Sequence, residues 1–63
     1  MRFVLLPLVN GESIGINVAE VSVITPVKKG TRVTLKDGMF YDVQPGLIEV
    51  FAALQKCVSN YPV

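Results

Sequence analysis

Two apolar runs, FVLLPLV and ESIGI, flank Asn10–Gly11 near the start of the chain and predict a β-hairpin. Asn-Gly tolerates the positive φ angles of a type I′ turn, so we expect a two-residue turn. In that register Val9 faces Glu12 and Leu5 faces Ile16. Both faces of the first strand are then apolar, with Phe3, Leu5 and Pro7 on one face and Val4, Leu6 and Leu8 on the other.

The stretch that follows this hairpin indicates a short turn and a third strand. Asn17 can cap a helical turn. The segment NVAEV is too short for a longer helix, so we expect a single turn. The β-branched run VSVIT then predicts a strand that we expect Pro26 to end. The sequence VKKGT, residues 27–31, reads as the next turn.

A second hairpin is predicted in LKDGMFYDV, where strand parity distinguishes two turns. A two-residue turn at Asp37–Gly38 would place Asp42 opposite Val33, on the apolar face, at a cost of several kcal/mol. A three-residue loop over 36–38, with Gly38 in the left-handed bulge position, avoids this cost. We therefore predict the bulged loop. It pairs Leu35 with Met39, Val33 with Tyr41, Thr31 with Val43 and, on the other face, Arg32 with Asp42.

After residues 44–46 (QPG), the apolar period changes from two to that of a helix. An amphipathic helix is expected to begin there and to end near Ser59 and Asn60. The predicted fold class is α+β: a small antiparallel β-meander of about five short strands, followed by one C-terminal amphipathic helix packed on one face. The helix stripe comprises Leu47, Val50, Phe51, Leu54, Cys57 and Val58.

The composition predicts that the chain binds a partner. A chain of 63 residues has room for one domain, residues 1–63, and buries only about 60% of its unfolded surface. Yet 51% of its residues are hydrophobic, and one helix can cover only one face of the sheet. No apolar run approaches the roughly 18 residues of a membrane span. We therefore expect a homo-oligomer without membrane contact, and an oligomer or partner interface formed by Val4, Leu6, Leu8, Phe40 and Ile48.

The side-chain inventory argues against catalysis. The chain has no histidine and a single cysteine, so His or Cys metal sites and Ser-His or Cys-His nucleophiles are not expected within one chain. We expect no enzyme, no cofactor and no metal. Cys57 falls in the apolar helix stripe, where a buried thiol acts as a small hydrophobe. A lone cysteine also favours an intracellular, cytoplasmic location.

The order of turns and strands resembles the FlbD-type small flagellar regulatory proteins. That family shares a Leu-Asn-Gly turn, a later Asn and a Thr-x-Val-x-Leu-x-x-Gly-x-x-Tyr-x-Val hairpin; a similar hairpin occurs in LytTR-type DNA-binding domains. The resemblance implies a small regulatory protein that is not an enzyme. The matching positions are Leu8, Asn10, Gly11, Asn17, Thr31, Val33, Leu35, Gly38, Tyr41 and Val43.

Two function classes remain open on the sequence. The first is transcriptional or post-transcriptional regulation through nucleic-acid binding, with basic residues on phosphates and an aromatic ring stacked on a base. Its candidate residues are Lys28, Lys29, Arg32, Lys36 and Phe40. The second is a protein-docking adaptor or inhibitor, phage- or plasmid-like, that binds a host protein through its apolar surface or an open strand edge. Net charge is only +1, so composition does not decide between them.

Overall fold

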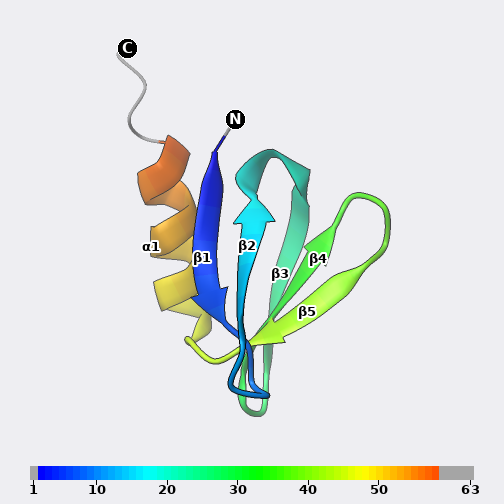
Figure 1. Ribbon diagram of the computed structural model, residues 1–63, viewed down its shortest axis with the longest axis vertical. Coiled ribbons are helices and arrows are strands. Elements are labelled where there is room, and N and C mark those ends of the chain that lie inside the picture. Colours follow the sequence, from blue (N-terminus) through cyan, green and yellow to red (C-terminus); the bar gives the residue numbers. More distant parts are fainter. Residues whose placement is uncertain (1, 59–63) are drawn as a thin grey trace.

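The computed structural model describes residues 2–58, in which five antiparallel strands precede one α-helix (Figure 1). A two-stranded sheet, β1-β2, lies against a three-stranded sheet with the order β3-β4-β5. This is the α+β fold class that the sequence predicts. The elements are β1 (Phe3–Pro7), β2 (Ser13–Asn17), the single 3₁₀ turn η1 (Val18–Glu20), β3 (Val21–Val27), β4 (Gly30–Leu35), β5 (Phe40–Val43) and α1 (Leu47–Val58).

The first hairpin closes through a three-residue loop, residues 9–11, and the predicted two-residue turn is wrong. The Leu8 N–H donates to the Glu12 carbonyl oxygen (2.6 Å), and the Gly11 N–H donates to that of Leu8 (3.0 Å). Gly11 alone in this loop has a positive φ, +96°. The Asn10 side chain instead accepts a hydrogen bond from the Glu12 N–H (2.9 Å). Asn10 therefore builds the loop through its side chain, not by adopting a left-handed backbone.

This loop shifts the strand register by one residue and exchanges the two faces of β1. Val4 pairs with Ile16, and Leu5 pairs with Gly15. Side chains alternate across a strand, so Ile14 and Ile16 of β2 share a face with Val4 and Leu6. In the predicted register, Ile16 would have shared a face with Leu5. The expectation that Val4, Leu6 and Leu8 face outward is therefore wrong.

The second hairpin has the predicted register throughout. Arg32 pairs with Asp42 and Val33 with Tyr41, and the Leu35 N–H donates to the Met39 carbonyl oxygen (2.7 Å). The loop over residues 36–38 carries its one positive φ, +94°, at Gly38. The bulged loop is confirmed.

The β3 strand does not end at Pro26, as the sequence suggested, but continues to Val27. It is an outer strand, with β4 on one side only. Proline is tolerated there because its missing N–H breaks no ladder bond. At the start of β3, Asn17 caps the 3₁₀ turn as expected, with its side-chain oxygen accepting from the Ala19 N–H (3.1 Å).

The two sheets join where β1 and β5 end. Leu8 forms an antiparallel bridge with Val43. The Val9 N–H donates to the Asp42 carbonyl oxygen (3.1 Å), and the Gln44 N–H donates to that of Pro7 (2.8 Å). Main-chain hydrogen bonds therefore connect the loop end of hairpin one to the end of β5.

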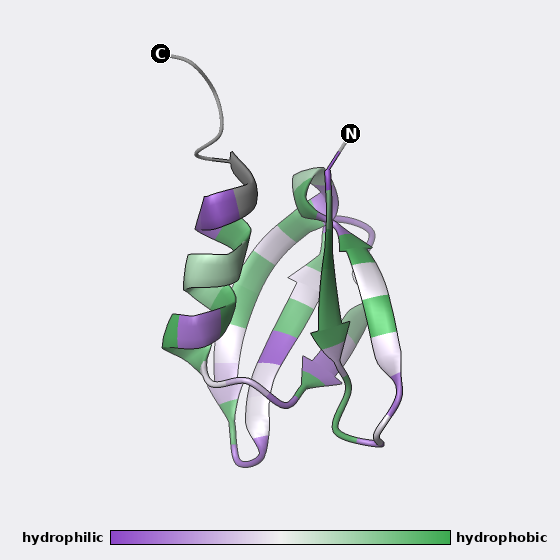
Figure 2. Ribbon diagram, turned by 60° about the vertical axis from the view of Figure 1, so that its left-hand side comes forward, coloured by the Kyte–Doolittle hydropathy of each residue, from purple (hydrophilic) through white to green (hydrophobic). Residues whose placement is uncertain are grey.

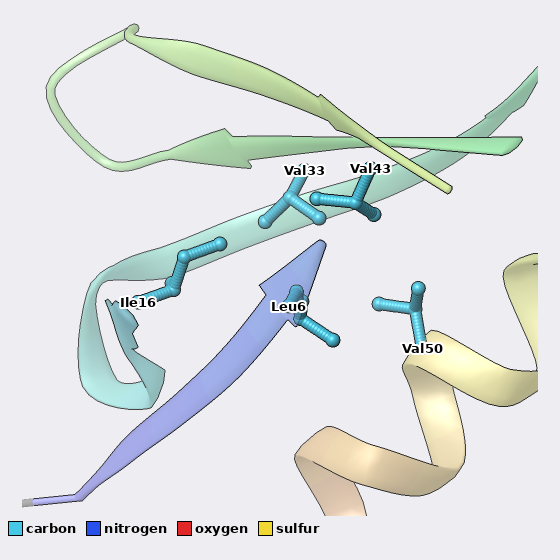
Figure 3. Packing of buried hydrophobic residues seen from close by; sticks show 5 residues of the cluster. All are labelled: Leu6, Ile16, Val33, Val43 and Val50. Carbon is cyan, nitrogen blue, oxygen red and sulfur yellow. The ribbon is translucent and has the colours of Figure 1, made fainter. Parts of the chain in front are cut away.

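The helix closes the core from the side of β1 and β3. Gly46 precedes its first turn, and the Glu49 carboxylate accepts from the Gly46 N–H (3.0 Å), as a residue at the third helical position can. Figure 2 shows the helix standing beside the strands. The predicted helix start is confirmed, whereas the predicted end at Ser59 and Asn60 and the side chain of Cys57 lie outside the described residues. The core side chains, which point toward one another in Figure 3, are Leu6, Ile16, Val33, Val43 and Val50.

Candidate interaction surfaces

The outward side of hairpin one carries two exposed apolar side chains, Phe3 and Leu5, which we call the outer face of hairpin one. Phe3 is 56% exposed and Leu5 is 73% exposed. Leu5 stands opposite Gly15, and Phe3 Cδ2 lies 4.0 Å from the position that a Gly15 Cβ would take. Because Gly15 has no side chain, the Phe3 ring lies close to its main chain on this face.

The structure places some residues of the predicted oligomer interface in the core and leaves others exposed. Leu6 is buried in the core, and Val4 and Leu8 pack against it, so these three are used within the chain. Phe40 and Ile48 are exposed, 51% and 77% respectively, but they lie on β5 and α1. Sequence reasoning assigned the wrong face of β1 because it assumed the wrong register.

Two residues of the predicted nucleic-acid site, Arg32 and Phe40, form a cluster with Asp42 on the outward side of hairpin two. The Arg32 Nε and Asp42 Oδ1 atoms are 2.9 Å apart, and a second bond joins Arg32 Nη2 to Asp42 Oδ2 (3.3 Å). The Arg32 guanidinium lies 4.3 Å from the centroid of the Phe40 ring. Hydrogen bonding to Arg32 lowers the pKa of Asp42, and the same bond raises the pKa of Arg32. Both groups are therefore held in their charged forms.

The three lysines of the predicted nucleic-acid site lie at the two ends of β4. Lys28 and Lys29 form the exposed two-residue turn between β3 and β4, while Lys36 is in the loop after β4. Strand β4 separates them, and six residues of strand span about 20 Å. Lys28 and Lys29 therefore lie at one end of β4 and Lys36 at the other, with Arg32 on the strand between them.

A shallow apolar groove runs between α1 and the outer strand β3. Its volume is about 280 Å³. Phe51, placed in the covered stripe by the sequence pattern, is 51% exposed at this groove. The sequence contained a signal for this exposure. Leu47, Val50 and Leu54 alone form a narrower apolar stripe on the helix, and Phe51 lies at its margin. The groove is lined by Val21, Ser22, Ile24, Phe51, Leu54 and Gln55.

A metal ion requires a cluster of ligating side chains, and a membrane span requires a long apolar helix. Among residues 2–58, no three His, Cys, Asp or Glu side chains come together as a metal site would require. No helix in the same range is long and apolar enough to cross a membrane.

Fold and surfaces together define a small two-sheet α+β protein closed by one helix, with apolar side chains on its exterior. No protein-family model, curated protein or solved structure matches this chain.

Proposed function

We propose that this chain is a small, non-enzymatic regulatory protein of the cytoplasm that self-associates and acts by binding another protein. The observation that carries the proposal is the outer face of hairpin one, where Phe3 and Leu5 are more than half exposed. Contiguous apolar surface on a small soluble domain is typical of a protein interaction site. Its removal from water contributes about 25 cal/mol per Å².

The charged residues favour protein binding over nucleic-acid binding. Arg32 is already paired with Asp42, so its charge is offset before any phosphate arrives. One side of the Phe40 ring is occupied by that guanidinium, which leaves less of the ring for a base. Nucleic-acid binding remains the second candidate because Lys28 and Lys29 are adjacent and exposed at one hairpin tip.

The regulatory and cytoplasmic parts of the proposal have separate support. The regulatory role rests on the resemblance to FlbD-type proteins and on an inventory without histidine. The cytoplasmic location rests on the single cysteine, because small secreted domains commonly depend on several disulfides.

Native mass measurement tests the proposal, using the chain alone and with single-stranded and duplex oligonucleotides at two salt concentrations. We expect oligomers without oligonucleotide, and no complex whose abundance falls steeply with salt. A salt-steep complex would instead select nucleic-acid binding, since phosphate contacts release counterions.

A hydrophobic dye tests the outer face of hairpin one directly. We expect the folded protein to bind the dye and the double variant Phe3→Ser/Leu5→Ser to bind much less, with Lys36→Glu as an exposed control. A folded monomer that binds no dye would contradict the proposal.

A further inference from the structure

The β3 strand has a free edge beside the apolar groove. It pairs with β4 alone. Val27 and Gly30 flank the two-residue turn, and the pair that closes such a turn is hydrogen-bonded. Since bonded and non-bonded pairs alternate, the Ile24–Val33 pair is non-bonded. The N–H and C=O groups of Ile24 therefore point away from β4, toward the open edge.

Nothing within the described residues pairs with this edge. The main-chain hydrogen bonds outside the regular elements include none from Ile24. On the helix side, the Ile24 side chain lines the groove together with Phe51 and Leu54. On the opposite side, the neighbouring Val23 is 52% exposed. An added strand would meet a main-chain donor and acceptor, with apolar surface on both faces.

We infer that a second copy of this chain occupies the β3 edge, pairing antiparallel with it about a two-fold axis at Ile24. This inference rests on the self-association proposed above and names its surface. At the axis, each Ile24 N–H donates to the Ile24 carbonyl of the other copy. The two three-stranded sheets then form one continuous sheet, with both grooves on the same side.

Charge complementarity selects a second copy as the occupant. Glu20, the last residue of η1, precedes one end of β3, and the Lys28–Lys29 turn follows its other end. Antiparallel pairing therefore places Glu20 of one copy beside the Lys28–Lys29 turn of the other, twice by symmetry. All three side chains are exposed. Opposite charges at both rims favour this orientation, because a parallel arrangement would bring like charges together.

Pro26 limits the pairing to a short segment. It has no N–H to donate, so it cannot extend the ladder along the new edge. Each copy presents the same edge to the other, so the contact is closed after two copies. The outer face of hairpin one, on the other sheet, remains available for a different partner.

Sedimentation of charge variants tests this interface, and all of the substitutions are at exposed residues. We expect Glu20→Lys to raise the dimer dissociation constant about tenfold, because two attractive rim pairs become repulsive. The combined variant Glu20→Lys/Lys28→Glu/Lys29→Glu should restore dimerisation, since it exchanges the charges. Glu20→Gln, which removes the attraction without adding repulsion, should raise the constant by a smaller factor.

Amide hydrogen exchange provides the second measurement on the same protein. The Ile24 amide should become more protected as concentration rises, whereas β2, the outer strand of the other sheet, should not change. A dimer unaffected by Glu20→Lys, with protection gained at β2, would overturn the β3 interface while leaving self-association intact. A monomer at every concentration would overturn both.

Discussion

The loops of the two hairpins, residues 8–12 and 35–39, differ in sequence but have the same structure. In both, the first N–H donates to the last carbonyl, at 2.6 and 2.7 Å, and the glycine N–H donates back to the first carbonyl at 3.0 Å. The Asn10 and Asp37 side chains each accept from the N–H two residues later at 2.9 Å. One motif, Leu-x-Asn/Asp-Gly, therefore determines the register of both hairpins.

The hairpins differ in the side chains that this shared register directs outward. Hairpin two presents Arg32 and Asp42, which bond to each other, and Phe40, which lies under the guanidinium. Hairpin one presents Phe3 and Leu5 around a glycine. Hairpin two therefore pairs its outward charges with each other, whereas hairpin one leaves two apolar side chains exposed.

The largest expected effect comes from a glycine outside these two loops, Gly30. A Cβ at this position would overlap the Val43 carbonyl oxygen and come within 2.8 Å of the Gln44 carbonyl oxygen. We expect Gly30→Ala to cost on the order of the whole stability of a small domain, about 5 kcal/mol. Urea denaturation measures this loss.

The loop glycines provide the matched comparison for Gly30→Ala. Gly11 and Gly38 have no atom within 4 Å of an added Cβ, so alanine there meets only the strain of a left-handed backbone. That strain amounts to about 1–2 kcal/mol. Equal losses at Gly30 and Gly38 would contradict the close approach of β4 to Val43.

Leu6→Ala and Leu5→Ala test which face of hairpin one is covered. Leu6 is 5% exposed in the core, and its truncation should cost about 2–5 kcal/mol. Leu5 is 73% exposed, and its truncation should change the free energy of unfolding by less than about 0.5 kcal/mol. The reverse order in thermal or urea unfolding would indicate the register of a two-residue turn.

Asn10→Ala and Asp37→Ala test the equivalence of the two loops. Each variant removes one side-chain to main-chain hydrogen bond, so each should lose about 1 kcal/mol of stability. The exchanges Asn10→Asp and Asp37→Asn keep the accepting oxygen and serve as controls. Losses that differ by more than about 1 kcal/mol would show that the loops are not equivalent.

The smallest expected effect is the pH dependence of the Arg32–Asp42 pair. The folded pKa of Asp42 lies below its ordinary value of 3.8, so the folded state binds this proton less readily than the unfolded state. The stabilisation is therefore complete above pH 3.8 and is lost as pH falls through the lowered value. Asp42→Asn should remove this part of the acid dependence in unfolding curves between pH 6 and 2. An unchanged acid limb would show that the pair makes no contribution.

The difference between the hairpins also explains how much could be predicted from the sequence. In hairpin two, a charged Asp42 penalises one of the two registers, so strand parity predicted the loop and the ion pair. In hairpin one, both faces of β1 are apolar, so neither register carries a penalty and the Asn-Gly turn preference gave the wrong answer. The helix start was predictable from Gly46 and the change of period.

The groove and the β3 edge could not be predicted from local patterns. Phe51 has the spacing of a core residue, and its exposure depends on the angle at which α1 meets β3. Likewise, β3 is an edge strand because the chain turns back at η1 and hairpin one joins β5 instead. Both features follow from tertiary arrangement.

Cross-strand nuclear Overhauser effects in hairpin one test most directly whether the two hairpins share one loop and one inward face. The structure predicts contacts of Val4 with Ile16 and of Leu6 with Ile14, with Leu8 opposite Glu12 across a three-residue loop. Contacts of Leu5 with Ile16 and of Val9 with Glu12 would instead show a two-residue turn. That result would return Phe3 and Leu5 to the covered side and would contradict the exposure of the outer face of hairpin one, on which the proposed function rests.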